Sequence, residues 1–343
     1  MKKQKIFKLK GTIENLKKQG LGIITVSNGE WYSLLKDEIR NSIAIEGVFA
    51  NRNELLDVLE KNKKTDKQKT ASILGYFESA SSVYEYANNQ FKEKEFLLKI
   101  SDIKQIHSLL MKYEKKFGSY TGTIGDFRNS DIEVAKANFK PISHFYVREA
   151  VELLVKWVNW KLKEKNFDVL KLAVASHVWF ETIHPFRDGN GRVGRILLSY
   201  ILIGSGLVNI SIKGIAKSDR EKYYKVLEAA DDCFEKINRD LEKGIKISLS
   251  ELDQYIEKQD FSAVENMALS CLEKSVNRLK LTRGLSLEPD AILPLRKLAV
   301  AFDYSPDYLR NLINRGKIKA TKRGKLWYIR LGDMQDYINS VHE

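Results

Sequence analysis

Proline, cysteine and long apolar runs are all scarce in this chain of 343 residues. Cys233 and Cys271 are too few to build a disulfide framework, and such scarcity is typical of a reducing compartment. The five prolines and twenty glycines form no biased tract, which excludes a fibrous or disordered class. Serines and glycines interrupt the most apolar run, residues 196–208, whereas a membrane span needs roughly 18 apolar residues. We therefore expect a soluble folded protein with no membrane partner.

An export signal is also missing from the amino-terminal sequence. The basic start, Met1–Lys5, leads to no apolar signal core and no cleavage site of small residues, so we expect a cytoplasmic protein. The length allows two or three domains, and the 43% hydrophobic content is ample for their cores. A net charge of +13 suggests an acidic partner such as nucleic acid, although charge alone adds little to that expectation.

The densest polar stretch lies between two apolar segments that have the length and spacing of buried helices. Residues 168–183 place Leu172 and Trp179 on one helical face, and residues 192–207 predict a second helix. The junction between them therefore ends in a helix amino terminus, whose amides lack intrahelical partners. Together with the helix dipole, these amides predict an anion site suited to phosphate oxygens.

The side chains of this junction add chemistry to the predicted phosphate site. Arg192 and Arg195 share one face of the first helical turns and can present guanidinium groups to the same phosphates. Asp188 is a hard oxygen ligand for a Mg²⁺ that bridges those phosphates, and His184 can take a proton near neutral pH. Phe186 is expected to point inward. A basic loop without function would explain any one of these residues, but the full set favours a phosphate-transfer site with a base.

The stretch from His184 to Arg195 resembles the signature of the Fic (Fido) domain proteins, His-x-Phe-x-Asp/Glu-Gly-Asn-Gly-Arg-x-x-Arg, at every defined position. The resemblance implies an enzyme that moves a nucleotide monophosphate, most often AMP from MgATP, onto a Ser, Thr or Tyr hydroxyl of a target protein. It implies that His184 deprotonates the hydroxyl and that Asp188 holds the metal. It assigns phosphate oxygens to Asn190, to the amides of Gly189 and Gly191, and to Arg192 and Arg195.

A second match concerns Ser42–Gly47, at the end of a helix predicted over about residues 31–47 with Gly47 as its cap. Glu46 lies near the carboxy terminus of that helix, where an acid is slightly unfavourable. The segment is similar to the inhibitory helix of Fic proteins, Ser/Thr-x-x-x-Glu-Gly/Asn. The similarity implies that Glu46 pairs with Arg195 and keeps ATP out of a productive pose. Ser42 is expected to bond locally and set the helix, and the alternative for Glu46 is an ordinary surface glutamate.

Further segments carry weaker signals. Gly125–Arg128 resembles the Gly-x-Phe-Arg element ahead of the Fic flap, so residues 129–145 are expected to form a hairpin that pairs with an extended target segment. His107 is expected to be a buried structural histidine. Tyr223 or Tyr224 is a candidate for stacking on adenine, although core packing is favoured. A short strand over residues 22–26 and a turn at residues 28–29 are also predicted.

The last fifty residues form a separate pattern. A helix over residues 298–302, a cap and proline at Ser305–Pro306, a second helix ending at Gly316 and two strands around Arg323–Gly324 predict a winged helix-turn-helix. The pattern resembles excisionase and MerR-type DNA-binding domains, whose second helix enters the major groove. The candidate contacts to double-stranded DNA are Arg310, Asn311, Arg315, Lys322, Arg323 and Lys325. The alternative is a winged domain used for protein contact.

Together these features predict a mainly α-helical protein with a Fic-type helical bundle, a β-hairpin flap and a small winged domain. The expected divisions are residues 1–98, a core over 99–215, a helical extension and linker over 216–288, and the winged domain over 289–343. The extension is a candidate for homo-oligomer contacts, and residues 282–286 for the linker. The leading interpretation is a self-inhibited protein adenylyltransferase that uses ATP and Mg²⁺. The alternatives are a DNA-binding regulator whose core senses nucleotide, and a Fic enzyme that uses another nucleotide or removes AMP.

Overall fold

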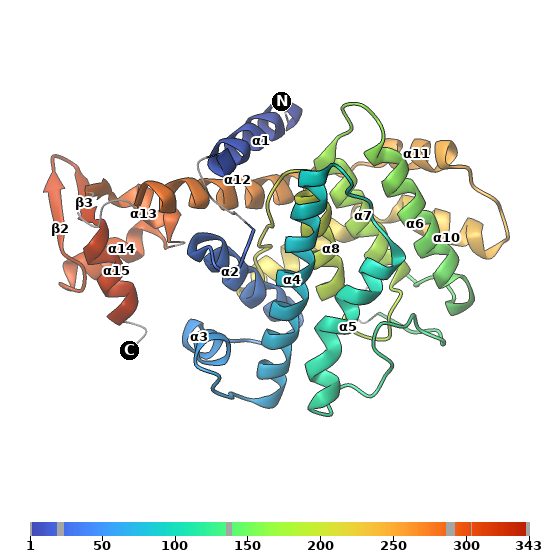
Figure 1. The fold of residues 1–343 in the computed structure, drawn as a ribbon, viewed down its shortest axis with the longest axis horizontal. Helices are drawn as coiled ribbons and strands as arrows, with labels where there is room; N and C mark the ends of the chain where they lie inside the picture. The colour runs from blue at the N-terminus through green and yellow to red at the C-terminus, as the bar shows by residue number, and fades with distance from the viewer. Residues whose placement is uncertain (1, 19–23, 135–138, 286–291, 303, 341–343) are drawn as a thin grey trace.

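The computed structural model describes residues 2–18, 24–134, 139–285, 292–302 and 304–340. A large helical body is joined to a small carboxy-terminal domain by one long helix, α12 (Figure 1). The body begins with α1 (Lys2–Lys18), α2 (Gly29–Ile45), α3 (Arg52–Glu60), α4 (Lys67–Glu93) and α5 (Ile100–Lys116). It continues with a 3-10 turn, η1 (His144–Tyr146), and with α6 (Val147–Leu162), α7 (Val169–Ile183), α8 (Asn190–Gly204), α9 (Lys217–Glu228), α10 (Asp232–Glu242), α11 (Leu249–Lys258) and α12 (Ser262–Leu285).

Short polar side chains start the helices that matter most for the site. The Asn28 side chain accepts a hydrogen bond from the Trp31 amide at 3.0 Å and caps α2. The turn predicted at residues 28–29 is therefore wrong, because Asn28 begins a helix. The predicted strand is also wrong for residues 24–26, which form bends and a turn, while residues 22–23 lie outside the described residues. Asp168 caps α7 in the same way, and α7 ends directly before the polar junction.

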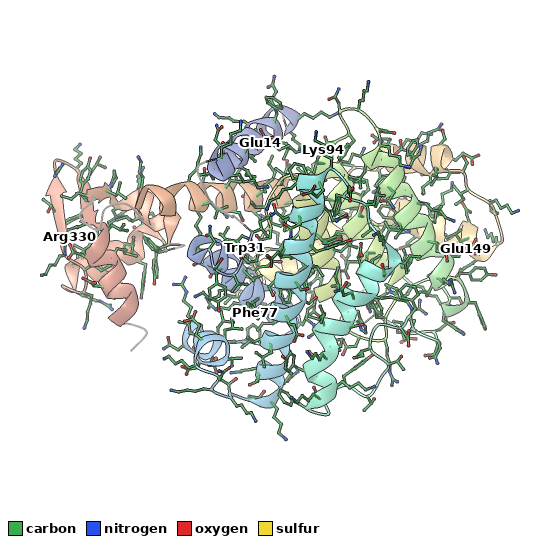
Figure 2. The ribbon with its side chains drawn as sticks, viewed as in Figure 1. Glu14, Trp31, Phe77, Lys94, Glu149 and Arg330 are labelled. Carbon is green, nitrogen blue, oxygen red and sulfur yellow. The ribbon has the colours of Figure 1, made fainter. Side chains whose placement is uncertain are left out.

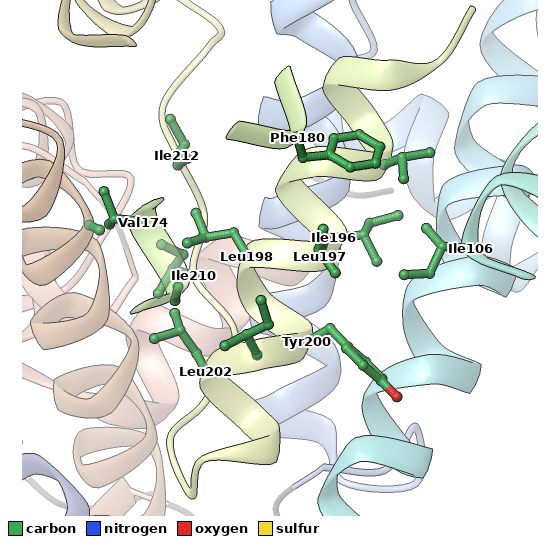
Figure 3. Packing of buried hydrophobic residues seen from close by; sticks show 14 of the residues in the cluster. Ile106, Val174, Phe180, Ile196, Leu197, Leu198, Tyr200, Leu202, Ile210 and Ile212 are labelled. Atoms are coloured by element: carbon green, nitrogen blue, oxygen red, sulfur yellow. The ribbon is translucent and has the colours of Figure 1, made fainter. Parts of the chain in front are cut away.

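The core of the body is built around α8, which is buried from Val193 to Gly204. Figure 3 shows its apolar side chains, among them Ile196 and Leu197, among residues of the surrounding segments such as Ile106 of α5 and Phe180 of α7. Each fully buried Ile, Leu or Phe side chain contributes roughly 1.5–3 kcal/mol. The helix that carries the two arginines of the junction is thus anchored in the core along most of its length.

The helix α2 is tied to the body by polar contacts as well as apolar ones. Figure 2 labels Trp31 at its start, and the indole nitrogen of Trp31 donates to Asn209 at 2.9 Å. The buried carboxylate of Glu38 accepts hydrogen bonds from Tyr76 at 3.0 Å and Tyr84 at 2.5 Å. Asn209 also donates to Glu38, at 2.7 Å. These contacts fix the position of the whole helix, including its last turn.

The segment expected to be a hairpin flap is not regular in its described parts. Residues 129–134 and 139–143 form bends and extended chain without a strand, so a hairpin is absent from the described part of this segment. Exposure still alternates at its start, where Ile132 and Val134 are half-buried and Glu133 is exposed. This alternation belongs to an extended chain with one side turned towards the body.

The carboxy-terminal domain has its own core and a three-stranded antiparallel sheet. Its elements are β1 (Ile292–Pro294), α13 (Leu295–Ala301), α14 (Pro306–Asn314), β2 (Ala320–Arg323), β3 (Leu326–Arg330) and α15 (Leu331–Ser340), with strand order β1-β3-β2. Ser305 caps α14 by accepting from the Tyr308 amide at 3.0 Å, as the sequence predicted. The short strand β1 was not predicted. Residues 282–285, expected in a linker, continue α12, and residue 286 lies outside the described residues.

The two parts also meet away from α12. Arg52, at the start of α3, donates to the Tyr304 hydroxyl at 3.2 Å, with its guanidinium 5.3 Å from the Tyr304 ring centroid. The long helix α12 is in turn fastened to α2 of the body, because Arg278 forms an ion pair with Asp37 and donates to Ser33 at 2.5 Å. Within the described ranges, no helix is both long enough and apolar enough to cross a bilayer.

Candidate active site

The polar junction between α7 and α8 is a compact loop closed by its own side chains. Asn190 accepts from the Phe186 amide and donates to the Phe186 carbonyl, both at 2.8 Å. The Phe186 ring is buried, as predicted. Gly189 has φ +80°, a conformation that glycine adopts without steric cost. The resemblance assigned the Asn190 side chain to phosphate oxygens, but both of its polar groups here brace the loop.

A buried histidine from α5, His107, packs against this loop. The His107 ring stacks on Phe186 with centroids 3.9 Å apart and planes 3° apart. Its Nδ1 accepts from the Gly125 amide at 2.8 Å, so Nε2 carries the hydrogen and donates to the Asp188 carbonyl at 3.3 Å. Burial lowers the pKa of His107 to about 4. His107 is therefore neutral and structural, which confirms the prediction.

His184 has the geometry of a proton acceptor. Its Nδ1 lies 3.2 Å from the Glu181 carbonyl, which can only accept, so the hydrogen is on Nδ1 and the lone pair of Nε2 remains available. Burial is the largest influence on its pKa and lowers it, and the nearby Arg128 acts in the same direction. Glu46 and Asp188 oppose this shift. The net effect keeps the imidazole neutral at neutral pH, as a general base requires.

The two arginines of α8 are buried, and each faces a carboxylate from a different helix. Arg192 pairs with Glu114 of α5, which also accepts from Ser72 at 3.2 Å. Arg195 donates to the Ser42 hydroxyl at 2.7 Å, to the Ser42 carbonyl at 3.1 Å and to Glu46 at 2.6 Å. The pair of Arg195 with Glu46 is the one that the similarity to the inhibitory helix implied. The pair of Arg192 with Glu114 was not predicted.

The last turn of α2 therefore lies over the amino terminus of α8. A Cβ atom added to Gly191 would collide with Oε1 of Glu46, so the carboxylate sits directly on the glycine turn. Burial raises the pKa of Glu46, but Arg195 and Arg192 outweigh it, and the net pKa lies below its ordinary value. An ionised carboxylate thus occupies the position that the helix dipole and the free amides favour for an anion. The Ser42 hydroxyl was expected to bond within its own helix, and the structure shows it accepting a hydrogen bond from Arg195.

Asp188 lies at the exposed end of the loop, where it could meet a metal ion that arrives with its substrate. Its Oδ1 accepts from the Gly189 amide at 2.5 Å, which orients the carboxylate. In the described part of the chain, no group of three or more His, Cys, Asp or Glu side chains is arranged to hold a metal by itself. One carboxylate still fits Mg²⁺, which typically takes one or two carboxylates, phosphate oxygens and water.

A mostly buried acid beside this site, Glu181, was not predicted from the sequence. Glu181, one turn before His184, lies 3.8 Å from Nδ1 of His177, and burial raises the pKa of Glu181 to about 8. Among the described residues, neither Nδ1 of His177 nor Oε1 of Glu181 has a hydrogen-bond partner. His177 Nε2 lies 2.8 Å from the Tyr223 hydroxyl, so Tyr223 packs in the core as favoured. Tyr224 is partly exposed, and its hydroxyl donates to the Ile45 carbonyl at 3.1 Å. The close spacing of Glu181 and His184 was the signal available for this acid.

The candidate DNA contacts gather on exposed surfaces of the carboxy-terminal domain. Arg310 and Asn311 lie on α14, and Arg310 pairs with Asp307 one turn earlier at 2.9 Å. Beyond α14, the candidates Arg315, Lys322, Arg323 and Lys325 are all exposed, and so are the neighbouring basic residues Lys317 and Lys319. Lys322 lies over the Trp327 ring at 5.7 Å and Arg323 over the Tyr328 ring at 5.1 Å. Helix α14 and the wing, which is residues 322–325 at the turn between β2 and β3, thus present positive charge.

Comparison with known proteins gives matches for both parts of the chain. The model of the Fic/DOC family matches residues 97–202, and that of a helix-turn-helix domain matches residues 296–342. A probable protein adenylyltransferase of Aquifex aeolicus is 30% identical over 302 residues, which cover 88% of this chain and 86% of that protein. The protein adenylyltransferase Fic of Aedes aegypti is 26% identical over 57% of this chain and only 36% of its own length.

Solved structures agree at the level of the fold. The crystal structure of a Fic domain containing signaling protein from Bacteroides thetaiotaomicron gives a TM-score of 0.58 at 19% identity, covering 88% of this chain and 98% of that one. Fic-1 of C. elegans, residues 134–508, gives a TM-score of 0.58 at 18% identity, over 83% of this chain and 73% of that one. The likeness covers most of this chain.

Proposed function

The chain belongs to the Fic/DOC family, and from that membership we propose that it is a protein adenylyltransferase held inactive by its own α2 helix. Its substrates are ATP, carried with Mg²⁺, and a target protein that presents a Ser, Thr or Tyr hydroxyl. The observation that carries the proposal is the available Nε2 of His184 beside a glycine turn at the amino terminus of α8. A base and an anion site within one loop support transfer of a phosphorus group to a hydroxyl.

In the proposed reaction the hydroxyl oxygen of the target attacks the α phosphorus of ATP. His184 Nε2 accepts the hydroxyl proton as the new oxygen–phosphorus bond forms. The bond from the α phosphorus to the bridging oxygen breaks, and pyrophosphate leaves with that oxygen. Asp188 would hold a Mg²⁺ that arrives with ATP, and that ion would supply charge neutralisation. The amides of Gly189 and Gly191 and the guanidinium of Arg195 hold the phosphates in line.

Self-inhibition is proposed because Glu46 competes for Arg195. The guanidinium that the γ phosphate needs is engaged by the hydroxyl and carbonyl of Ser42 on α2 and by Glu46, which caps that helix. The Glu46 carboxylate also covers Gly191. The anchoring of α2 through Glu38 and through the ion pair between Asp37 and Arg278 keeps this arrangement in place. ATP can therefore meet the glycine turn productively only after the last turn of α2 moves away.

The proposal is tested by measuring the intact mass of the protein and of candidate targets after incubation with each nucleoside triphosphate and Mg²⁺. Glu46→Gly, in which the inhibition is relieved, is measured beside the parent and is the background for the His184 variant. An added AMP identifies ATP as donor, whereas an added phosphate or another nucleotide identifies the alternative chemistry. His184→Ala should abolish the mass increase while retaining the melting temperature. Labelling that persists in His184→Ala would remove the assignment of the base. Release of AMP from a labelled target would show the reverse reaction.

A second candidate function is binding of double-stranded DNA by the carboxy-terminal domain. The exposed basic side chains of α14 and the wing, in a region that matches a helix-turn-helix model, support it. Fluorescence anisotropy with a labelled duplex should show binding that weakens steeply with salt and disappears when residues 290–343 are removed. An absence of binding to mixed-sequence duplexes at low salt would favour a protein partner for this domain.

A further inference from the structure

Arg128, the last residue of the Gly-x-Phe-Arg element, is buried beside the polar junction between α7 and α8. Its side chain is only 1% exposed. Nε donates to the carbonyl of His184 at 2.9 Å, and an NH2 group reaches the carbonyl of Ile183 at 3.4 Å. The backbone amide of Arg128 donates to the Pro185 carbonyl at 2.9 Å. One residue therefore holds three successive peptide groups around the proposed base.

The same guanidinium also holds both described ends of the chain that follows it. It donates to the Ser130 carbonyl at 3.1 Å and, on the far side of the segment, to the Ile142 carbonyl. The Asp131 carboxylate lies 3.6 Å from Nη1 of Arg128, and it accepts from the amide of His144 at 2.7 Å. Arg128 thus connects the backbone of His184 with both described parts of the segment, the part at Ser130 and the part at Ile142.

This arrangement matters because the backbone of His184 is unusual. The residue has φ 53° and ψ 60°, the left-handed region, which costs an L-residue other than glycine roughly 1 kcal/mol or more. A strained conformation persists only when neighbouring contacts determine it. The His184 amide bonds to the Phe180 carbonyl at 3.0 Å, and Arg128 fixes the carbonyl on the other side. With both peptide groups fixed, the direction of the imidazole is fixed as well.

We propose that Arg128 is a positioning residue for the transfer reaction. Its forked guanidinium fixes the backbone of His184 relative to the segment of residues 129–143. The inference rests on the proposed function, because it assigns Arg128 to the reaction of His184. Arg128 does not touch ATP in this role. Only a planar, five-donor fork can reach carbonyls on several sides at once, which lysine cannot do.

The charge of Arg128 gives a second, independent effect on the base. The charged groups that act on the His184 imidazole are Arg128, which lowers its pKa, and Glu46 of α2 and Asp188 of the loop, which raise it. Burial is the largest influence and lowers it. Neutral glutamine in place of Arg128 removes a lowering influence, so the pKa of His184 should rise. Lysine keeps the charge but not the fork, so the two variants separate charge from geometry.

The experiment compares Arg128→Lys and Arg128→Gln, each combined with Glu46→Gly so that inhibition does not mask activity. Arg148→Gln, which changes a largely exposed arginine paired with Glu152, is the matched control. The readouts are melting temperature, ATP affinity, and kcat and KM for AMP transfer across pH. We expect Arg128→Lys to bind ATP normally and to lose about 100-fold in kcat, since small misplacements of reacting groups cost about that much. Arg128→Gln should also move the acid limb of the pH profile upward.

An NMR titration of the His184 imidazole keeps the proposal testable even if no variant transfers AMP. It should show a higher pKa in Arg128→Gln than in Arg128→Lys, both with glycine at position 46. The proposal is overturned if Arg128→Lys keeps the parent kcat, if the loss lies in ATP affinity alone, or if the titration is the same in both variants. Absence of transfer in Glu46→Gly itself would count against the proposed function and leave the titration to decide the role of Arg128.

Discussion

Replacing Glu46 by glycine should make the protein more active and less stable at the same time. In the structure, Arg195 is buried and donates to the Ser42 hydroxyl, the Ser42 carbonyl and Glu46. Removing Glu46 leaves Arg195 its two Ser42 acceptors and uncovers the glycine turn at Gly191. The freed guanidinium can then donate to the γ phosphate of ATP.

The two effects can be sized from the same contact. A hydrogen bond to a charged group is worth about 1.5–3 kcal/mol, so transfer of AMP should rise about 10- to 150-fold. Breaking a buried ion pair costs roughly 3–5 kcal/mol, but the Glu46 side chain is 33% exposed, so water will reduce that cost. We expect a loss of about 1–3 kcal/mol in the free energy of unfolding without ATP.

The assay measures AMP transfer from labelled ATP together with chemical denaturation with and without ATP. Glu46→Gln keeps the shape of the side chain and an acceptor for Arg195, so its rate should rise less than that of Glu46→Gly. Glu221→Gln removes an exposed acid that pairs with Lys217 on α9, and it should change neither quantity. If Glu46→Gly loses stability without any gain in transfer, the contact is structural and the inhibitory interpretation is wrong.

Three further predictions follow from the geometry of the site and of the carboxy-terminal domain. Because the pKa of His184 is lowered, transfer by Glu46→Gly should stay level from neutral pH to below the ordinary histidine value of about 6.5 and decline only beneath it. Initial rates at constant ionic strength check this, and an acid limb above that value would contradict a depressed pKa. Asn190→Ala should lose about 2–4 kcal/mol of unfolding free energy, because the Phe186 amide and carbonyl each lose a partner at 2.8 Å. Denaturation together with ATP affinity measures it, and lost affinity at full stability would instead place Asn190 on phosphate. In the full chain, Arg323→Ala and Lys325→Ala should each remove one phosphate contact, so the slope of the logarithm of the duplex binding constant against the logarithm of salt concentration should fall by about 1. A change in sequence preference would instead indicate contacts to bases.

Sequence alone was sufficient wherever the decisive residues are neighbours in the chain. The loop from His184 to Arg195 carries base, carboxylate, glycines and arginines within one junction, so local rules for helix ends already predicted an anion site. The same applies to the cap at Ser305 and to the inward position of Phe186. Local patterns failed at Asn28, because asparagine before glycine suits a turn and a helix cap equally well.

Tertiary structure decided which partner each buried charge has. Glu114 and Arg192 are 78 residues apart, and Arg128 meets the His184 carbonyl across 56, so no local pattern announces either contact. Asn190 turned inward to Phe186 because the loop leaves that amide and carbonyl without other partners, a fact that requires the folded backbone. A sequence states which groups are available. Burial decides which of them must find a partner, because an unpaired charge or peptide group in the interior costs more than packing returns.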